Sequence, residues 1–310
     1  MRVAICILFT FAAALACTQA HAKHMYQYTD EHGIVHFTDV APNGDVANVK
    51  STLVSTERQP LVRLRESGPD SDRSISFINS SGGPVSVAME FQEAANVIAD
   101  PALPTIIVLA AQTETHALQI TPQNVKAGYR YRYSYRYMPG DYRATADAKS
   151  AYRLPFDAAH EFPVGQAFGG SFSHHDAQNR YAVDIGMPEG TPVQAARDGV
   201  VMTVDNDFFG NGLDMAQYGD RANNIRIVHA DGAMSVYAHL ELESARVHVG
   251  QHVRAGQVIA LSGDTGFTSG PHLHFCVQVN SDMQLVAVPF QFAAAGATFT
   301  PVQGQMLGGD

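Results

Sequence analysis

Glycine-centred turns interrupt residues 152–300 at intervals too short for long helices. Pro188-Glu189-Gly190 and Ala230-Asp231-Gly232 are two such turns. Short apolar segments lie between the turns, such as Val200–Val204 and Ile225–Val228, and they are rich in the β-branched residues that strands favour. Because strands joined by tight turns run antiparallel, we expect this region to be almost entirely antiparallel β-sheet.

The composition favours a folded, β-rich protein. Of the 310 residues, 45% are hydrophobic and 16% are charged, which excludes a wholly disordered chain. The net charge of −10 argues against a nucleic-acid partner. Only 3 cysteines stand against 14 histidines. This imbalance excludes a disulfide scaffold and a thiolate metal site, and it leaves room for a histidine/carboxylate metal site.

The N-terminus is typical of a secretory signal peptide. An apolar run, Val3–Ala16, follows a positive charge, and Ala20-His21-Ala22 supplies small residues at the −3 and −1 positions. We therefore expect a signal peptide over 1–22, cleavage near Ala22, and an exported protein that is periplasmic or secreted. A lipoprotein signal would be cut before Cys17, but the preceding residues match a lipobox poorly. No other apolar run approaches the ~20 residues of a membrane span.

The chain that follows is predicted to form three modules. Residues 23–45 contain two aromatic-rich strands around a glycine turn, which predicts a small β-hairpin module. It resembles the short N-terminal hairpin domain of many exported bacterial proteins. Residues 46–74 are polar and are predicted to be a linker. Residues 75–150 are predicted to form a β-sandwich-like accessory domain, since Val85–Phe91 alternates with period two. The third module follows over 151–300, with a tail over 301–310.

One strand of the accessory domain alternates tyrosine with mostly basic residues. Strict alternation places all the tyrosines on one face. They either form a stacking platform for glycans or pack against a sandwich core while the arginines face solvent. The tyrosines are Tyr129, Tyr131, Tyr133, Tyr135 and Tyr137.

Histidines and one aspartate lie near the strands of the third module. His272 and His274 share one face of a strand because they are two residues apart. Asp184 lies between apolar residues, so its carboxylate needs a partner that a metal would supply. His174 and His239 lie near other strand ends. Each signal is weak alone, but their order along the chain is specific.

Together these residues resemble the catalytic domain of lysostaphin-type (LytM-like) zinc metallopeptidases, which cut peptidoglycan peptides. Four stretches carry the resemblance, namely Ser173–Asp184, Pro188–Val201, Asn224–Leu240 and Val253–Phe275. The resemblance implies a mainly β, antiparallel metallopeptidase domain that binds one zinc ion per chain.

The resemblance also implies residue roles. His174, Asp184 and His274 fall on the metal ligands, and His239 and His272 fall on the two non-ligand histidines beside the metal. Ten positions separate the first two ligands here, whereas the short family form is His-x-x-x-Asp. His175 is therefore an alternative first ligand.

Two imidazoles and one carboxylate leave a fourth tetrahedral position for water, the layout of a catalytic zinc site. His239 and His272 would serve as proton acceptor and oxyanion stabiliser, in an order that the sequence leaves open.

These features predict an exported zinc-dependent endopeptidase that hydrolyses peptide cross-links of peptidoglycan through a metal-activated water. Two alternatives are a secreted peptidase of glycine-rich proteins and a non-catalytic family member that activates a cell-wall amidase. The second would usually lack some ligands, whereas all five positions are filled here. A lipoyl- or biotinyl-carrier fold is disfavoured, because no lysine follows Lys149 to carry the modification.

Overall fold

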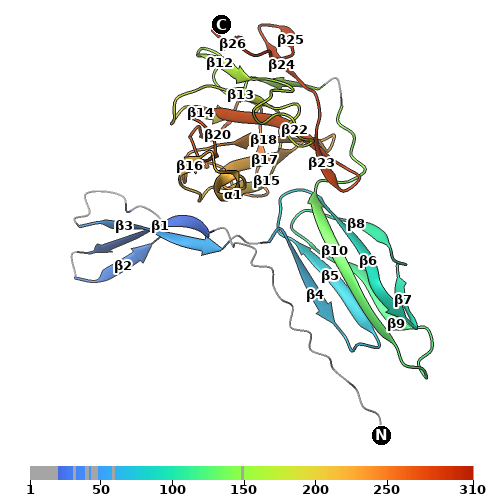
Figure 1. Cartoon of the computed structure of the whole chain (residues 1–310). Helices are drawn as coiled ribbons and strands as arrows, with labels where there is room; N and C mark the ends of the chain where they lie inside the picture. The colour runs from blue at the N-terminus through green and yellow to red at the C-terminus, as the bar shows by residue number, and fades with distance from the viewer. Residues whose placement is uncertain are drawn as a thin grey trace. The chain divides into compact units, whose positions relative to one another are not determined.

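The computed structural model describes residues 20–30, 33–38, 42, 48–57, 60–147 and 150–309. All but the last three residues of the predicted signal peptide lie outside this range. The chain divides after Gln59 into two compact units (Figure 1). Among the described residues, no helix has the length and apolar character that crossing a membrane requires.

The first unit is a three-stranded antiparallel sheet in the order β2-β1-β3. Its strands are β1 (Ala20–Thr29), β2 (Val35–Thr38) and β3 (Lys50–Glu57). The turn between β1 and β2 contains Gly33, whose positive φ of 79° suits glycine and whose N–H donates to the carbonyl of Asp30. Strands β1 and β2 form an antiparallel hairpin, as expected for this region, but β1 begins at Ala20, before the predicted module, and β3 lies in the range predicted to be a linker.

The second unit begins with two antiparallel sheets that share one core. One sheet has the order β4-β5-β9-β7 and the other β10-β6-β8. Their bounds are β4 Val62–Ser67, β5 Arg73–Asn79, β6 Val85–Ala95, β7 Val97–Asp100, β8 Thr105–Leu109, β9 Glu114–Pro122 and β10 Arg130–Pro139. Strand β4 lies in the predicted linker over 46–74. In this strand Val62 and Leu64 alternate with arginines, and Val62 is buried. This alternation explains why the segment forms a strand.

The tyrosine strand is β10, and its aromatic face packs on the sandwich core. Three of its tyrosines, Tyr131, Tyr133 and Tyr137, and the preceding Tyr129 pack against the buried cluster that contains Phe77. The ring of Tyr135 lies 5.0 Å from that of Phe77. Of the two interpretations of the tyrosines, these contacts favour core packing.

The third module is built on a nine-stranded sheet (Figure 1). Eight strands follow the order β19-β15-β17-β18-β22-β13-β12-β26, and β23 pairs with β22. Their bounds are β12 Glu161–Gln166, β13 Val183–Ile185, β15 Gly199–Asp205, β17 Asn224–Val228, β18 Met234–Ala238, β19 His252–Val253, β22 Leu273–Ser281, β23 Gln284–Ala287 and β26 Met306–Gly308. The predicted tail over 301–310 therefore contains a sheet strand, and Leu307 within it is buried.

Smaller pieces surround this sheet. They are β11 Ala151–Arg153, β14 Pro192–Gln194, β16 Asn211–Gly212, α1 Met215–Tyr218, β20 Val258–Leu261, β21 Gly266–Phe267, β24 Gln291–Ala294 and β25 Ala297–Phe299. Strand β16 pairs in parallel with β21, and β11 pairs in parallel with β24. The fold is thus mainly β and largely antiparallel, as predicted.

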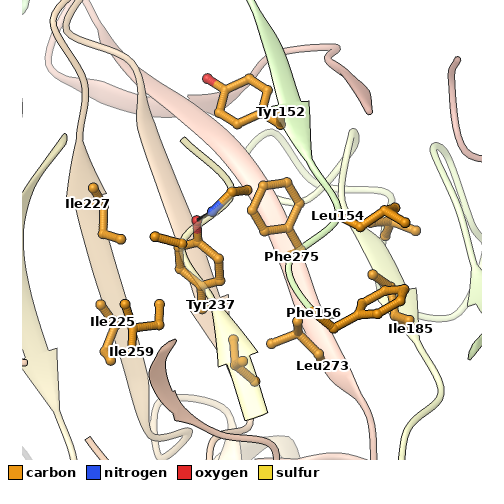
Figure 2. Packing of buried hydrophobic residues seen from close by; sticks show 14 of the residues in the cluster. Tyr152, Leu154, Phe156, Ile185, Ile225, Ile227, Tyr237, Ile259, Leu273 and Phe275 are labelled. Atoms are coloured by element: carbon orange, nitrogen blue, oxygen red, sulfur yellow. Dashed lines mark hydrogen bonds between the residues drawn. The ribbon is translucent and has the colours of Figure 1, made fainter. Parts of the chain in front are cut away.

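The core of this module lies directly behind the histidine strand. Leu273 and Phe275 of β22 alternate with His274 and with His272, the residue just before the strand, and both apolar side chains are fully buried. Figure 2 shows Phe275 beside Tyr237, and Leu273 beside Phe156 in the same cluster. Period-two alternation therefore anchors one face of β22 in the core and holds the histidines on the other.

Candidate metal centre

Strand register brings the aspartate and one histidine side by side. Strand β22 lies between β13 and β18, and Asp184 of β13 is paired with His274. His274 is also paired with Ala238, the residue before His239. Three segments that are far apart in sequence therefore converge on a single point of the sheet.

His174 reaches this point from the loop after β12, and its ring orientation is fixed. Its side chain is fully buried, its Nδ1 lies 2.9 Å from the carbonyl of Ala167, and its Nε2 lies 3.1 Å from Asp184 Oδ1. A carbonyl can only accept, so Nδ1 carries the proton and the Nε2 lone pair is directed at the centre. By contrast, His175 is exposed.

Gln166 supports both the loop and the carboxylate. Its Oε1 accepts from the backbone N–H groups of Phe172 and Ser173, at 3.0 and 3.2 Å. Its Nε2 donates to Asp184 Oδ2 at 2.9 Å, which leaves Oδ1 for the centre. Sequence reasoning missed this residue, because a lone glutamine in a strand carries no signal of such a role.

His174, Asp184 and His274 present one ligand atom each, all within 4.8 Å of one another. His274 Nδ1 lies 2.9 Å from Asp184 Oδ1. Burial raises the pKa of Asp184, but hydrogen bonds from the two histidines outweigh it and hold that pKa well below its usual range. Burial lowers the pKa of His274, yet the bond to Asp184 raises it overall to about 10. A partly buried carboxylate that draws positive charge toward two imidazoles fits a divalent cation such as zinc.

His239 and His272 lie beside this trio without being part of it. Their ring centroids are 4.5 Å apart, and His272 Nε2 lies 3.7 Å from Asp184 Oδ1. Each Nδ1 is next to a backbone carbonyl, that of Thr265 at 2.7 Å for His239 and that of Gly270 at 2.8 Å for His272. Both rings are thereby held with Nδ1 protonated and with Nε2 free to accept a proton.

The environment of His239 is unusual in two ways. Its φ of +62° lies in the left-handed region, which is strained for a residue with a side chain. Burial, with the neighbouring His272 and His274, lowers its pKa to about 3. The ring is therefore neutral at neutral pH.

The structure thus brings together all five residues that the sequence singled out, and it leaves His175 outside. Two other residues of the matching motifs are structural supports. Tyr237 is buried in the core and accepts from the backbone N–H of Ala196 at 2.7 Å. Asn224 donates to Asp205 Oδ2 at 3.0 Å.

Two parts of the chain match known protein families. Residues 178–285 match the model of peptidase family M23, and residues 11–60 match a domain of unknown function, DUF4124. The M23 match includes Asp184, His239, His272 and His274 but begins after His174, whose assignment rests on geometry.

Three relatives illustrate the similarity. Lysostaphin of Staphylococcus simulans is 36% identical over 128 residues, which cover 39% of this chain and 24% of that protein. The DD-carboxypeptidase/endopeptidase Mpg of Neisseria meningitidis is 39% identical over 98 residues, covering 32% of this chain and 20% of Mpg. Peptidoglycan DD-endopeptidase ShyA of Vibrio cholerae is 41% identical over 93 residues, which cover 30% of this chain and 18% of ShyA. The chain thus matches about a quarter or less of each relative's length.

Among solved structures, the catalytic domain of lysostaphin from Staphylococcus simulans aligns with 40% of this chain and 82% of its own, at 31% identity and a TM-score of 0.29.

Proposed function

We propose that this chain, which carries a peptidase family M23 domain over residues 178–285, is an exported zinc-dependent endopeptidase that hydrolyses peptide cross-links of peptidoglycan. The observation that carries this proposal is the convergence of five side chains. Two imidazoles and a carboxylate face one another within 4.8 Å, and two further imidazoles lie beside them with Nε2 free.

We propose that His174 Nε2, Asp184 Oδ1 and His274 Nδ1 hold one zinc ion. Bound there, zinc would polarise the scissile carbonyl and activate a water molecule. Gln166 keeps the Asp184 carboxylate oriented, and the Ala167 carbonyl keeps the His174 lone pair directed at the ion.

We propose that His239 and His272 handle the protons. Hydrolysis of an amide requires a group that takes a proton from water and a donor for the leaving amine. The two rings lie 4.5 Å apart, and each has its Nδ1 on a backbone carbonyl. One ring can therefore accept the proton from water at Nε2 and pass it to the leaving amine, while the other, protonated, stabilises the oxyanion.

The substrate assignment rests on the relatives. Peptidoglycan is named as the substrate of ShyA, and another relative, ALE-1 of Staphylococcus capitis, is named a glycyl-glycine endopeptidase. We therefore propose peptide cross-links of the cell wall as the substrate, with cleavage of glycine-rich protein as the competing outcome. Export is proposed from the signal-peptide pattern over 1–22.

Hydrolysis of purified peptidoglycan by the zinc-loaded full chain tests this function. We expect His272→Ala and His239→Ala to lose about 10²–10⁴-fold in rate while retaining zinc, because each removes a proton-transfer group. His248→Ala is the matched control, since His248 is exposed and outside the site. Wild-type rates in both site variants, or cleavage of glycine-rich protein alone, would overturn the proposal.

A further inference from the structure

A buried hydroxyl links a carboxylate to one of the two proton-transfer histidines. Thr268 is only 3% exposed, and its Oγ1 lies 2.9 Å from Asp264 Oδ1 and 3.3 Å from His272 Nδ1. We propose that Asp264 and Thr268 are positioning residues that fix the tautomer and orientation of His272. This role deepens the proposed hydrolysis and rests on it.

The direction of each hydrogen bond follows from the groups present. The Thr268 hydroxyl has two acceptors in reach, Asp264 Oδ1 at 2.9 Å and the Gly270 carbonyl at 2.8 Å. Charge-assisted bonds are the stronger ones, so its proton goes mainly to Asp264. Its oxygen then accepts, and Gly270 N–H donates to it at 3.0 Å. The remaining lone pair faces His272 Nδ1, which must therefore carry a proton.

The Gly270 carbonyl acts on the same nitrogen. It lies 2.8 Å from His272 Nδ1, so the Nδ1–H is shared between this carbonyl and the Thr268 oxygen. Both acceptors exclude the tautomer with the proton on Nε2. The His272 Nε2 lone pair is thereby directed at the space beside Asp184, from whose Oδ1 it lies 3.7 Å. At His239 the Nδ1 instead meets a backbone carbonyl, that of Thr265, at 2.7 Å.

The Asp264 carboxylate is in turn held by a residue of strand β16, which precedes α1. Asn211 Nδ2 donates to Asp264 Oδ2, and Asn211 lies in β16, which pairs with β21. Asp264 precedes β21 and Thr268 follows it. The four side chains Asn211, Asp264, Thr268 and His272 thus form one continuous chain of contacts from this loop to the site.

Two substitutions at Thr268 separate hydrogen bonding from packing. Thr268→Val keeps the shape of the side chain and removes the hydroxyl, whereas Thr268→Ser keeps the hydroxyl. We expect Thr268→Val to lower kcat about 10–100-fold, the usual effect of losing such a supporting contact, with little change in KM or zinc content. Thr268→Ser should retain most of kcat. Thr191→Val is the control, because that hydroxyl donates only to the carbonyl of Pro188 in a turn.

A double-mutant cycle tests whether the two residues act together. If Asp264 works through Thr268, the loss of kcat in Asp264→Ala combined with Thr268→Val will be no larger than in Thr268→Val alone. Multiplicative losses would contradict a shared role.

The tautomer itself provides a readout that does not depend on activity. Nitrogen-15 NMR of the zinc-loaded full chain, with imidazole nitrogens labelled, should show His272 protonated at Nδ1 in the wild type and in Thr268→Ser. In Thr268→Val the Gly270 carbonyl still accepts from Nδ1, so we expect the Nδ1 resonance of His272 to shift as the hydroxyl contact is lost and the ring reorients. An unchanged His272 signal together with wild-type kcat in Thr268→Val would overturn the positioning role. A wild type with this tautomer but without hydrolysis would overturn the proposed function alone.

Discussion

Backbone carbonyls help determine which ring nitrogen is available in three of the site histidines. Ala167, Thr265 and Gly270 each supply a carbonyl to an Nδ1. The identities of the histidines could be predicted from motif order. Their tautomers could not, because the carbonyls belong to loops whose path depends on the whole sheet.

The choice between adjacent histidines gives the first prediction. His174→Ala should abolish stoichiometric zinc binding, because this buried ring lies 3.1 Å from Asp184. His175→Ala should retain the metal, because that side chain is exposed. Elemental analysis of both variants checks this expectation. Zinc lost from the second variant and kept by the first would reverse the assignment.

A second residue-scale prediction concerns stability and pH. Burial lowers the pKa of His229 to about 4, and its Nε2 lies 3.0 Å from the Ser235 hydroxyl. The folded state therefore favours the neutral ring, so its contribution is complete above the unfolded pKa near 6.5 and is lost as the pH falls toward 4. We expect protonation of His229 to reduce the free energy of unfolding by up to about 3 kcal/mol between pH 7 and pH 4.

Urea denaturation between pH 7 and pH 4 measures this effect. His229→Gln removes the titrating group, so its free energy of unfolding should fall less steeply with acid than that of the wild type. Parallel curves for the two proteins would rule out the contribution.

At the scale of elements, period-two alternation predicted strands well, whereas short strands in polar stretches were missed. The apolar alternation of β22 predicted both the core face and the site face. Strands β4 and β26 were predicted to be linker and tail, because short strands in polar surroundings carry little signal of their own. Strand β26 is only three residues long, and its partner β12 lies more than 140 positions earlier. Such a strand forms only by pairing with β12, so its local sequence pattern does not predict it.

Strand β26 provides a matched pair for a third prediction. Leu307 is 1% exposed, whereas its neighbour Met306 is 50% exposed. Leu307→Ala should reduce the free energy of unfolding by about 2–4 kcal/mol through lost burial and a residual cavity. Met306→Ala should change it by less than about 0.5 kcal/mol. Equal effects in denaturant melts would mean that β26 does not contribute to the core.

At the scale of the molecule, the accessory sandwich and the M23 domain share part of one core. Met202, Val228 and Met234 of the M23 domain belong to the same buried cluster as Phe77 of the sandwich. The Gly82 N–H donates to the Met202 carbonyl at 3.0 Å. The sequence predicted separate modules, and it could not reveal this contact because the partners lie more than 100 residues apart.

Gly82 tests the contact between sandwich and M23 domain. A Cβ added there would lie 2.1 Å from the Val201 carbonyl oxygen and 2.5 Å from the Gly250 nitrogen, so backbone must shift. Gly82→Ala should therefore cost about 1–3 kcal/mol of stability. Gly128→Ala, where a Cβ meets nothing within 4 Å, is the control in the same sandwich. Similar melting curves for wild type and Gly82→Ala would refute close packing here.

Mass spectrometry of muropeptides after digestion in ¹⁸O-labelled water tests the central claim most directly. Zinc-loaded full chain should convert cross-linked muropeptides into uncross-linked ones, with a new amine on one product and a single ¹⁸O atom in the new carboxylate of the other. His272→Ala should leave the cross-links intact. Unchanged cross-links with the wild type, or ¹⁸O found only at sugar ends or at the sugar–peptide junction, would contradict a zinc endopeptidase of peptidoglycan cross-links.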